Sequence, residues 1–129
     1  MGPPANLYGL QSAPCDVLVL AIRLDGRPLT GLTGHVDWRT GGRISRLIRE
    51  GVVPERGPLL LPAPPILGAR RLLLWATADV TPDALARCLK GLGDEVVGVC
   101  PADLGLDAGI VRAALGPRAV LYSAEAGEG

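Results

Sequence analysis

The stretch DVLVLAIR at residues 16–23 gives the strongest structural signal in the chain. Its apolar residues follow one another without polar alternation, which is typical of a strand that is covered on both faces. The stretch RRLLLWA at 70–76 has the same character. Two strands of this kind predict a largely parallel sheet that lies between two layers of helices.

Weaker signals surround these two strands and alternate between helix and strand. Helices are predicted over 30–51 with a break at Gly41 and Gly42, after a Thr81 cap, and over 107–115 with Ile110, Val111, Ala114 and Leu115 buried. Further strands are predicted at 57–62, 95–100 and 118–122. This order predicts a three-layer α/β/α sandwich with a mixed, mostly parallel sheet, although the pattern does not fix the strand order.

The length and composition predict one domain. The chain has 129 residues, of which 48% are hydrophobic and 20% are charged, so a disordered chain is excluded. The Gly- and Pro-rich residues 1–14 are expected to form a flexible leader, held down only around 7–10. The folded domain then covers 15–123, and 124–129 form a frayed tail.

The charge balance and the cysteines indicate which partners and which cell compartment to expect. Thirteen basic residues balance thirteen acidic ones, which argues against nonspecific binding to nucleic acid. The longest apolar run, Val17–Ile22, is far shorter than the roughly 20 residues of a membrane-spanning helix. Three cysteines without a CxxC pair, and a start without signal-peptide character, predict a cytoplasmic protein with no membrane partner.

The residue pattern contains no recognisable catalytic or metal-binding motif. The single histidine, His35, lacks partners at metal-ligand spacing, and Cys88 and Cys100 fall on predicted buried faces. Trp75 is expected in the core and Trp38 half-buried against the sheet. The sequence therefore predicts no catalytic residue, no metal and no cofactor.

The pattern favours a plain break between two helices at 40–43 and leaves a small-ligand site there as the alternative. The turn at 25–28 follows the first strong strand, and the stretch 40–43 opens a helix with two glycines and an arginine, as a phosphate-binding loop would. Neither matches a known nucleotide-binding motif. The candidate ligand-binding residues are Asp25, Gly26, Gly41, Gly42 and Arg43.

The order of these segments resembles a known family. The strand at 16–22 precedes the dipeptide Val36-Asp37 and the run GRISRLIREG at 42–51, and a strand at 57–61 and RRLLL at 70–74 follow. This arrangement resembles the N-terminal domain of the leucyl aminopeptidase (cytosol aminopeptidase) family. The resemblance implies a macro-domain-like fold. It carries over no metal ligand, because that family's metal site lies in a second domain that nothing in this chain matches.

Three interpretations follow from this resemblance. The main one is a noncatalytic module for protein association or regulation, which would self-associate or bind an aminopeptidase catalytic subunit. A second is a macro-like binder of ADP-ribose or a related nucleotide, since macro-like folds often hold such ligands at the carboxyl ends of their strands. A third is part of a leucyl aminopeptidase whose catalytic domain lies elsewhere. In each case the chain by itself is expected not to be an enzyme.

Overall fold

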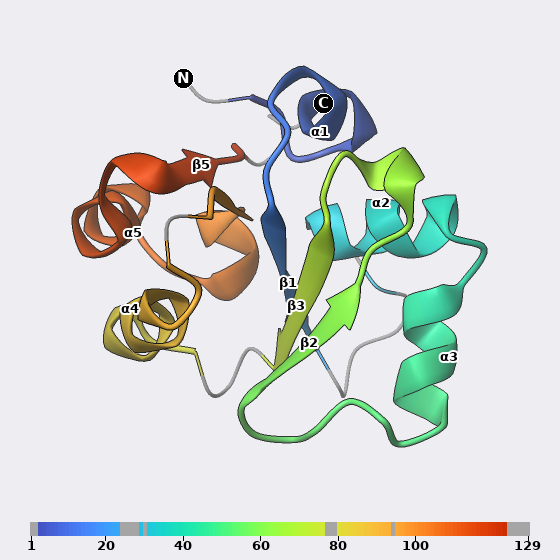
Figure 1. Ribbon diagram of the computed structural model, residues 1–129. Coiled ribbons are helices and arrows are strands. Elements are labelled where there is room, and N and C mark those ends of the chain that lie inside the picture. Colours follow the sequence, from blue (N-terminus) through green and yellow to red (C-terminus); the bar gives the residue numbers. More distant parts are fainter. Residues whose placement is uncertain (1–2, 24–28, 30, 77–79, 94, 124–129) are drawn as a thin grey trace.

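The computed structural model of the protein describes residues 3–23, 29, 31–76, 80–93 and 95–123. They form a mixed five-stranded sheet in the order β2-β3-β1-β4-β5 (Figure 1). The strands are β1 (Val17–Ile22), β2 (Pro58–Pro62), β3 (Arg71–Ala76), β4 (Val97–Val99) and β5 (Ala119–Leu121). Only β2 runs antiparallel to its neighbour, so the predicted mixed, mostly parallel sheet is confirmed.

Helices cover both faces of this sheet. The α-helices are α1 (Leu7–Ser12), α2 (Gly31–Arg39), α3 (Arg43–Arg49), α4 (Pro82–Lys90) and α5 (Ala108–Leu115). Short 3₁₀ turns form η1 (Pro65–Leu67), η3 (Pro101–Leu104) and η4 (Gly116–Arg118). No helix in these described segments is long and apolar enough to cross a membrane.

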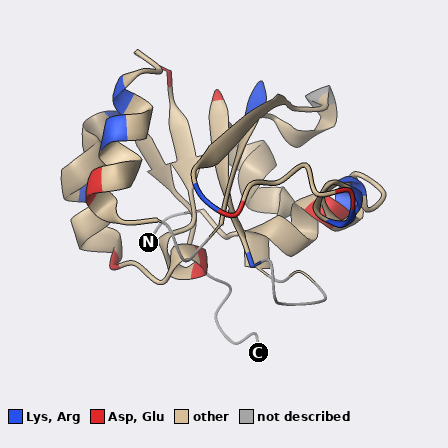
Figure 2. Ribbon diagram, turned by 90° about the horizontal axis from the view of Figure 1, so that it is seen from below, with Lys and Arg blue, Asp and Glu red and all other residues tan. Residues whose placement is uncertain are grey.

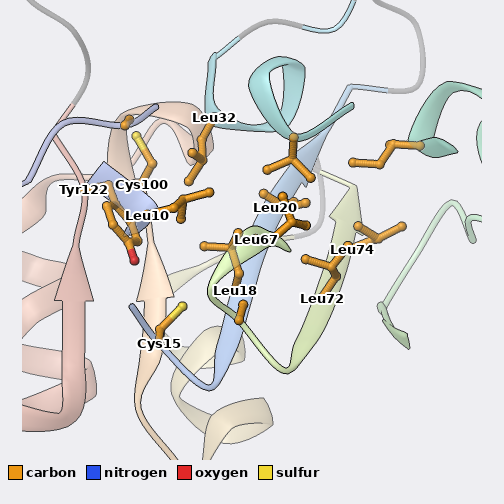
Figure 3. Packing of buried hydrophobic residues seen from close by; sticks show 14 of the residues in the cluster. Leu10, Cys15, Leu18, Leu20, Leu32, Leu67, Leu72, Leu74, Cys100 and Tyr122 are labelled. Carbon is orange, nitrogen blue, oxygen red and sulfur yellow. The ribbon is translucent and has the colours of Figure 1, made fainter. Parts of the chain in front are cut away.

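The central strand β1 separates two apolar cores, because its side chains alternate between the faces of the sheet. Leu18, Leu20 and Ile22 pack with residues of α1, α2 and α3. Figure 3 shows Leu18 and Leu20 of this core with Leu10, Leu32 and Tyr122. On the other face, Val17 and Val19 pack with residues of α4 and α5. Burial on both sides explains why β1 is apolar throughout.

Local sequence signals account for most helix boundaries. Thr81 caps α4 by accepting a hydrogen bond from the Ala84 N–H at 3.1 Å, and Pro82 begins the helix. The predicted break between two helices lies where it was expected, because Gly41 and Gly42 have φ of +70° and +83°. This left-handed conformation ends one helix before the next begins.

The N-terminal segment joins the core. Leu10 of α1 is only 1% exposed, and the Ala5 N–H donates to the carbonyl of Ser123 at 2.8 Å. The Tyr122 hydroxyl in turn donates to the Ala13 carbonyl at 2.5 Å. These contacts tie residues near the start of the chain to the end of β5.

Three residues predicted to be buried or half-buried are exposed. Ile110 is 55% exposed and Ala114 is also exposed, whereas Val111 and Leu115 are buried as predicted. Successive helical residues are about 100° apart around the helix axis, so a short helix that points Val111 at the sheet turns Ile110 toward solvent. Trp38, predicted to be half-buried against the sheet, is 76% exposed near the end of α2.

Candidate ligand-binding crevice

The carboxyl ends of β1, β3, β4 and β5 share one edge of the sheet, because these strands are parallel. After β1 the chain passes to α2 on one face, whereas after β4 it passes through η3 to α5 on the other face. Adjacent strands whose connections leave in opposite directions form a topological switch point, and open α/β sheets bind ligands in the crevice there. The β1–β4 edge is therefore the candidate site.

A hollow of about 340 Å³ opens on the β4–β5 side of this switch point. This volume is at the lower end of the range for small-molecule sites. Its walls are formed by Pro101 and Ala102 of η3, by residues 106–108 at the start of α5, and by residues 121–123 at the end of β5. The hollow thus lies directly beyond the carboxyl ends of β4 and β5.

One of the free N–H groups at the start of α5 is hydrogen-bonded by a side chain of this protein. Asp107 caps this helix, since one of its carboxylate oxygens accepts a hydrogen bond from the Ile110 N–H at 3.1 Å. Asp107 also lines the hollow and is exposed. One wall of the hollow therefore presents a carboxylate that can accept hydrogen bonds from hydroxyl or amino groups of a ligand.

A second carboxylate connects the two sides of the switch point. Asp103 of η3 accepts a hydrogen bond through Oδ2 from the Leu32 N–H at 2.8 Å. Leu32 is the second residue of α2, so Asp103 caps a helix that lies 71 residues earlier in the chain. This bond ties the segment after β4 to the segment after β1.

The surroundings of Asp103 alter its acidity. Burial raises the pKa of Asp103, while the hydrogen bond from Leu32 and the nearby charge of His35 act in the opposite direction. Burial, assisted by the charge of Asp103, raises the pKa of the neighbouring Cys100 thiol to about 11. Cys100 is therefore a thiol rather than a nucleophilic thiolate near neutral pH, as its predicted inertness requires.

The other thiols have the same character. Burial raises the pKa of Cys15. It also raises the pKa of Cys88, which is only partly buried. Among the described residues, no three histidine, cysteine or acidic side chains come together as a metal site would need. Basic and acidic residues are interspersed in the view of Figure 2 and form no single charged face there.

Of the five residues predicted to bind a ligand, Gly41, Gly42 and Arg43 belong to the part of the chain that the structure describes. Asp25 and Gly26 fall outside the described residues. Gly41, Gly42 and Arg43 form the turn between α2 and α3, at the opposite end of α2 from Leu32. With a rise of 1.5 Å per residue, that turn is about 12 Å from Leu32 along the helix. A ligand role for these five residues remains a prediction.

The turn at Gly41–Arg43 already has an internal acceptor beside it. Asp37 accepts hydrogen bonds from the Ser45 N–H at 2.9 Å and from the Ser45 hydroxyl at 2.6 Å. Its carboxylate thereby occupies the start of α3, where a bound anion would otherwise find free N–H groups.

Asp103, Asp107 and the segment around them were not predicted to be ligand-binding residues. A usable signal was present, because the stretch CPADLGLD at 100–107 directly follows a predicted strand and ends in a helix-capping aspartate. A loop between a buried strand and a helix is where open α/β sheets place ligand contacts.

Comparison with known proteins supports the fold and corrects the family. No family model matches the chain, and no curated protein matches it. The macrodomain of Mycobacterium tuberculosis DarG aligns with a TM-score of 0.58 and 18% identity, covering 89% of this chain and 91% of that one. The macrodomain of Thermus aquaticus DarG aligns with a TM-score of 0.56 and 15% identity over the same shares.

These similarities confirm the macro-domain-like α/β fold. They do not link the chain to the leucyl aminopeptidase family, and the resemblance to that family's N-terminal domain is correct only in the fold that it implied. The interpretation of the chain as a noncatalytic aminopeptidase-like module for association or regulation was wrong. The error arose because a shared fold does not fix a function, so the order of strands and helices could indicate the fold but not the family.

Proposed function

We propose that the protein binds ADP-ribose, or a closely related nucleoside diphosphate, in the crevice at the carboxyl ends of β4 and β5. The observation that carries this proposal is the hollow of about 340 Å³ beyond β4 and β5, in a chain whose fold is similar to macrodomains. Macro-like folds often hold ADP-ribose or related nucleotides at this edge of the sheet.

The chemistry of the walls supports a nucleotide better than a simple anion. Apolar surface from Pro101, Leu106 and Leu121 can contact a flat base, while Asp107 can accept hydrogen bonds from ribose hydroxyls. The balanced charge of the chain argues for a small ligand rather than a nucleic-acid backbone.

Isothermal titration calorimetry with ADP-ribose tests the proposal. We expect saturable heat for the wild-type chain and its loss in Ala108→Trp, because Ala108 lines the hollow and a tryptophan side chain would fill it. Ala113→Trp is the matched control, since Ala113 is exposed on the same helix but does not line the hollow. Absence of heat at millimolar ADP-ribose, or equal effects of both substitutions, would refute the proposal.

The same crevice is also the place to look for hydrolysis. The expectation that the chain is not an enzyme remains a prediction, and the comparisons give no support for a peptidase. Incubation with a mono-ADP-ribosylated protein, followed by chromatography of the supernatant, measures release of free ADP-ribose. Release that Ala108→Trp abolishes would make the chain an ADP-ribosyl hydrolase, and no release would leave it a binding module.

A further inference from the structure

The start of α2 is hydrogen-bonded to η3, the turn that forms one wall of the proposed ligand crevice, and is not open to a ligand anion. The first N–H groups of a helix have no partner within the helix, and together with the helix dipole they attract negative charge. In this chain the Leu32 N–H already donates to Oδ2 of Asp103 at 2.8 Å. A protein carboxylate therefore occupies the position that a phosphate group would favour.

The backbone around Gly31 is shaped to accept this carboxylate. Gly31 has a φ of +64°, and a Cβ atom built there would lie 2.3 Å from Oδ1 and 2.7 Å from Oδ2 of Asp103. The carboxylate thus lies directly over the first residue of α2, and only glycine leaves room for it. Its position is fixed by two chain segments that are far apart in sequence.

Asp103 directly follows the wall of the hollow along the chain, although it does not line the hollow itself. Pro101 and Ala102, which line the hollow, directly precede it in η3. If a ligand in the hollow extended a phosphate toward α2, that phosphate would approach the partly buried carboxylate of Asp103, which carries the same sign of charge. Repulsion between like charges is strongest where solvent screening is weakest.

We propose that Asp103 is a specificity-determining residue of the crevice, which keeps ligand phosphates away from the start of α2 and leaves the uncharged part of the ligand unaffected. This inference rests on the proposed function, because it needs a nucleotide in the hollow. It predicts that the negative charge of Asp103 weakens binding of phosphorylated ligands and is neutral toward the same ligand without phosphates.

Calorimetry with two probes tests this specificity. ADP-ribose carries the diphosphate, and adenosine carries the same base and ribose without any phosphate. The substitution Asp103→Asn removes the charge and keeps an amide oxygen that can accept the Leu32 N–H. We expect Asp103→Asn to raise the affinity for ADP-ribose about threefold or more, as the size of charge effects at helix ends implies, and to leave that for adenosine within about twofold.

Glu50→Gln is the matched charge control. Glu50 is exposed at the end of α3, and its loss changes the net charge of the chain by the same amount. Figure 1 shows α3 on the flank of the molecule opposite α5. Neither affinity should change by more than about 1.5-fold in this variant, because exposed charges beyond about one Debye length are screened.

The outcomes separate this inference from the proposed function. If the wild type binds neither probe, the proposed function fails, and with it the basis for the inference. If the wild type binds ADP-ribose but Asp103→Asn leaves that affinity unchanged, or lowers it together with that of adenosine, Asp103 is only a structural cap. Should Asp103→Asn fail to fold, Asp103→Ser offers an uncharged capping oxygen. The change in its affinity for ADP-ribose relative to adenosine then tests the same inference.

Discussion

Gly98, in the middle of β4, lies where two buried side chains leave no room for a methyl group. A Cβ atom built at Gly98 would lie 2.7 Å from the Sγ of Cys15 and 2.7 Å from the Cε2 of Tyr122. Ordinary contacts between such atoms are about 3.5–4.0 Å, so Gly98→Ala requires a displacement of roughly 1 Å. Tyr122 cannot turn away freely, because its hydroxyl donates to the Ala13 carbonyl at 2.5 Å.

The expected loss in free energy of unfolding is the difference between two effects. An added methyl group in a well-packed core destabilises by about 1–3 kcal/mol. Replacing glycine by alanine also restricts the unfolded chain, which stabilises by about 0.4–1 kcal/mol. Overpacking should dominate in Gly98→Ala, with a net destabilisation of about 1–2 kcal/mol.

Urea denaturation followed by circular dichroism measures this change. Adding Cys15→Ala should recover at least about 0.5 kcal/mol of the loss, since removing the sulfur vacates one of the two contacts. Gly91→Ala is the control, because the nearest atom to its Cβ is 3.6 Å away and its φ is −73°. Its stability should stay within about 0.5 kcal/mol of wild type. An unchanged midpoint for Gly98→Ala, or no coupling to Cys15→Ala, would refute the packing argument.

Three further predictions concern polar groups in and between the layers. Thr33 is 1% exposed and donates to the Ala21 carbonyl at 2.6 Å, so Thr33→Val should destabilise by about 1–2 kcal/mol in urea denaturation, whereas Thr33→Ser should be milder. Asp37→Ala removes both hydrogen bonds to Ser45 and should lower the free energy of unfolding by about 1–2 kcal/mol. A change below about 0.3 kcal/mol would show that these bonds do not hold α2 to α3. Because the folded pKa of Cys100 is about 11, the unfolded thiol loses its proton first, and stability should fall between about pH 9 and pH 11 by at most about 1.4 kcal/mol per pH unit for this group. Cys100→Ala should show a shallower fall over that window in denaturation at stepped pH, and an identical fall would contradict the assignment.

Periodicity in the sequence was sufficient to predict the layers of the fold. The apolar runs that became β1 and β3 are buried on both faces, and the glycine break at 41–42 separates α2 from α3. These features depend on neighbouring residues, whose side-chain alternation and backbone preferences act within a few positions. For the same reason the sequence did not place Trp38 correctly, since exposure of a helical residue depends on how the helix packs.

The ligand crevice depends on tertiary structure. The strand order β2-β3-β1-β4-β5 brings the end of β4 next to the end of β1, and this neighbourhood creates the switch point. The same strand order lets the Asp103 carboxylate accept a hydrogen bond from the Leu32 N–H, although the two residues are 71 positions apart. The sequence by itself determined most of the strands and helices, although not α1, because those preferences are local. Which carboxylate meets which helix end is decided only when the sheet is assembled, because hydrogen bonds and charge interactions depend on distances that no spacing along the chain specifies.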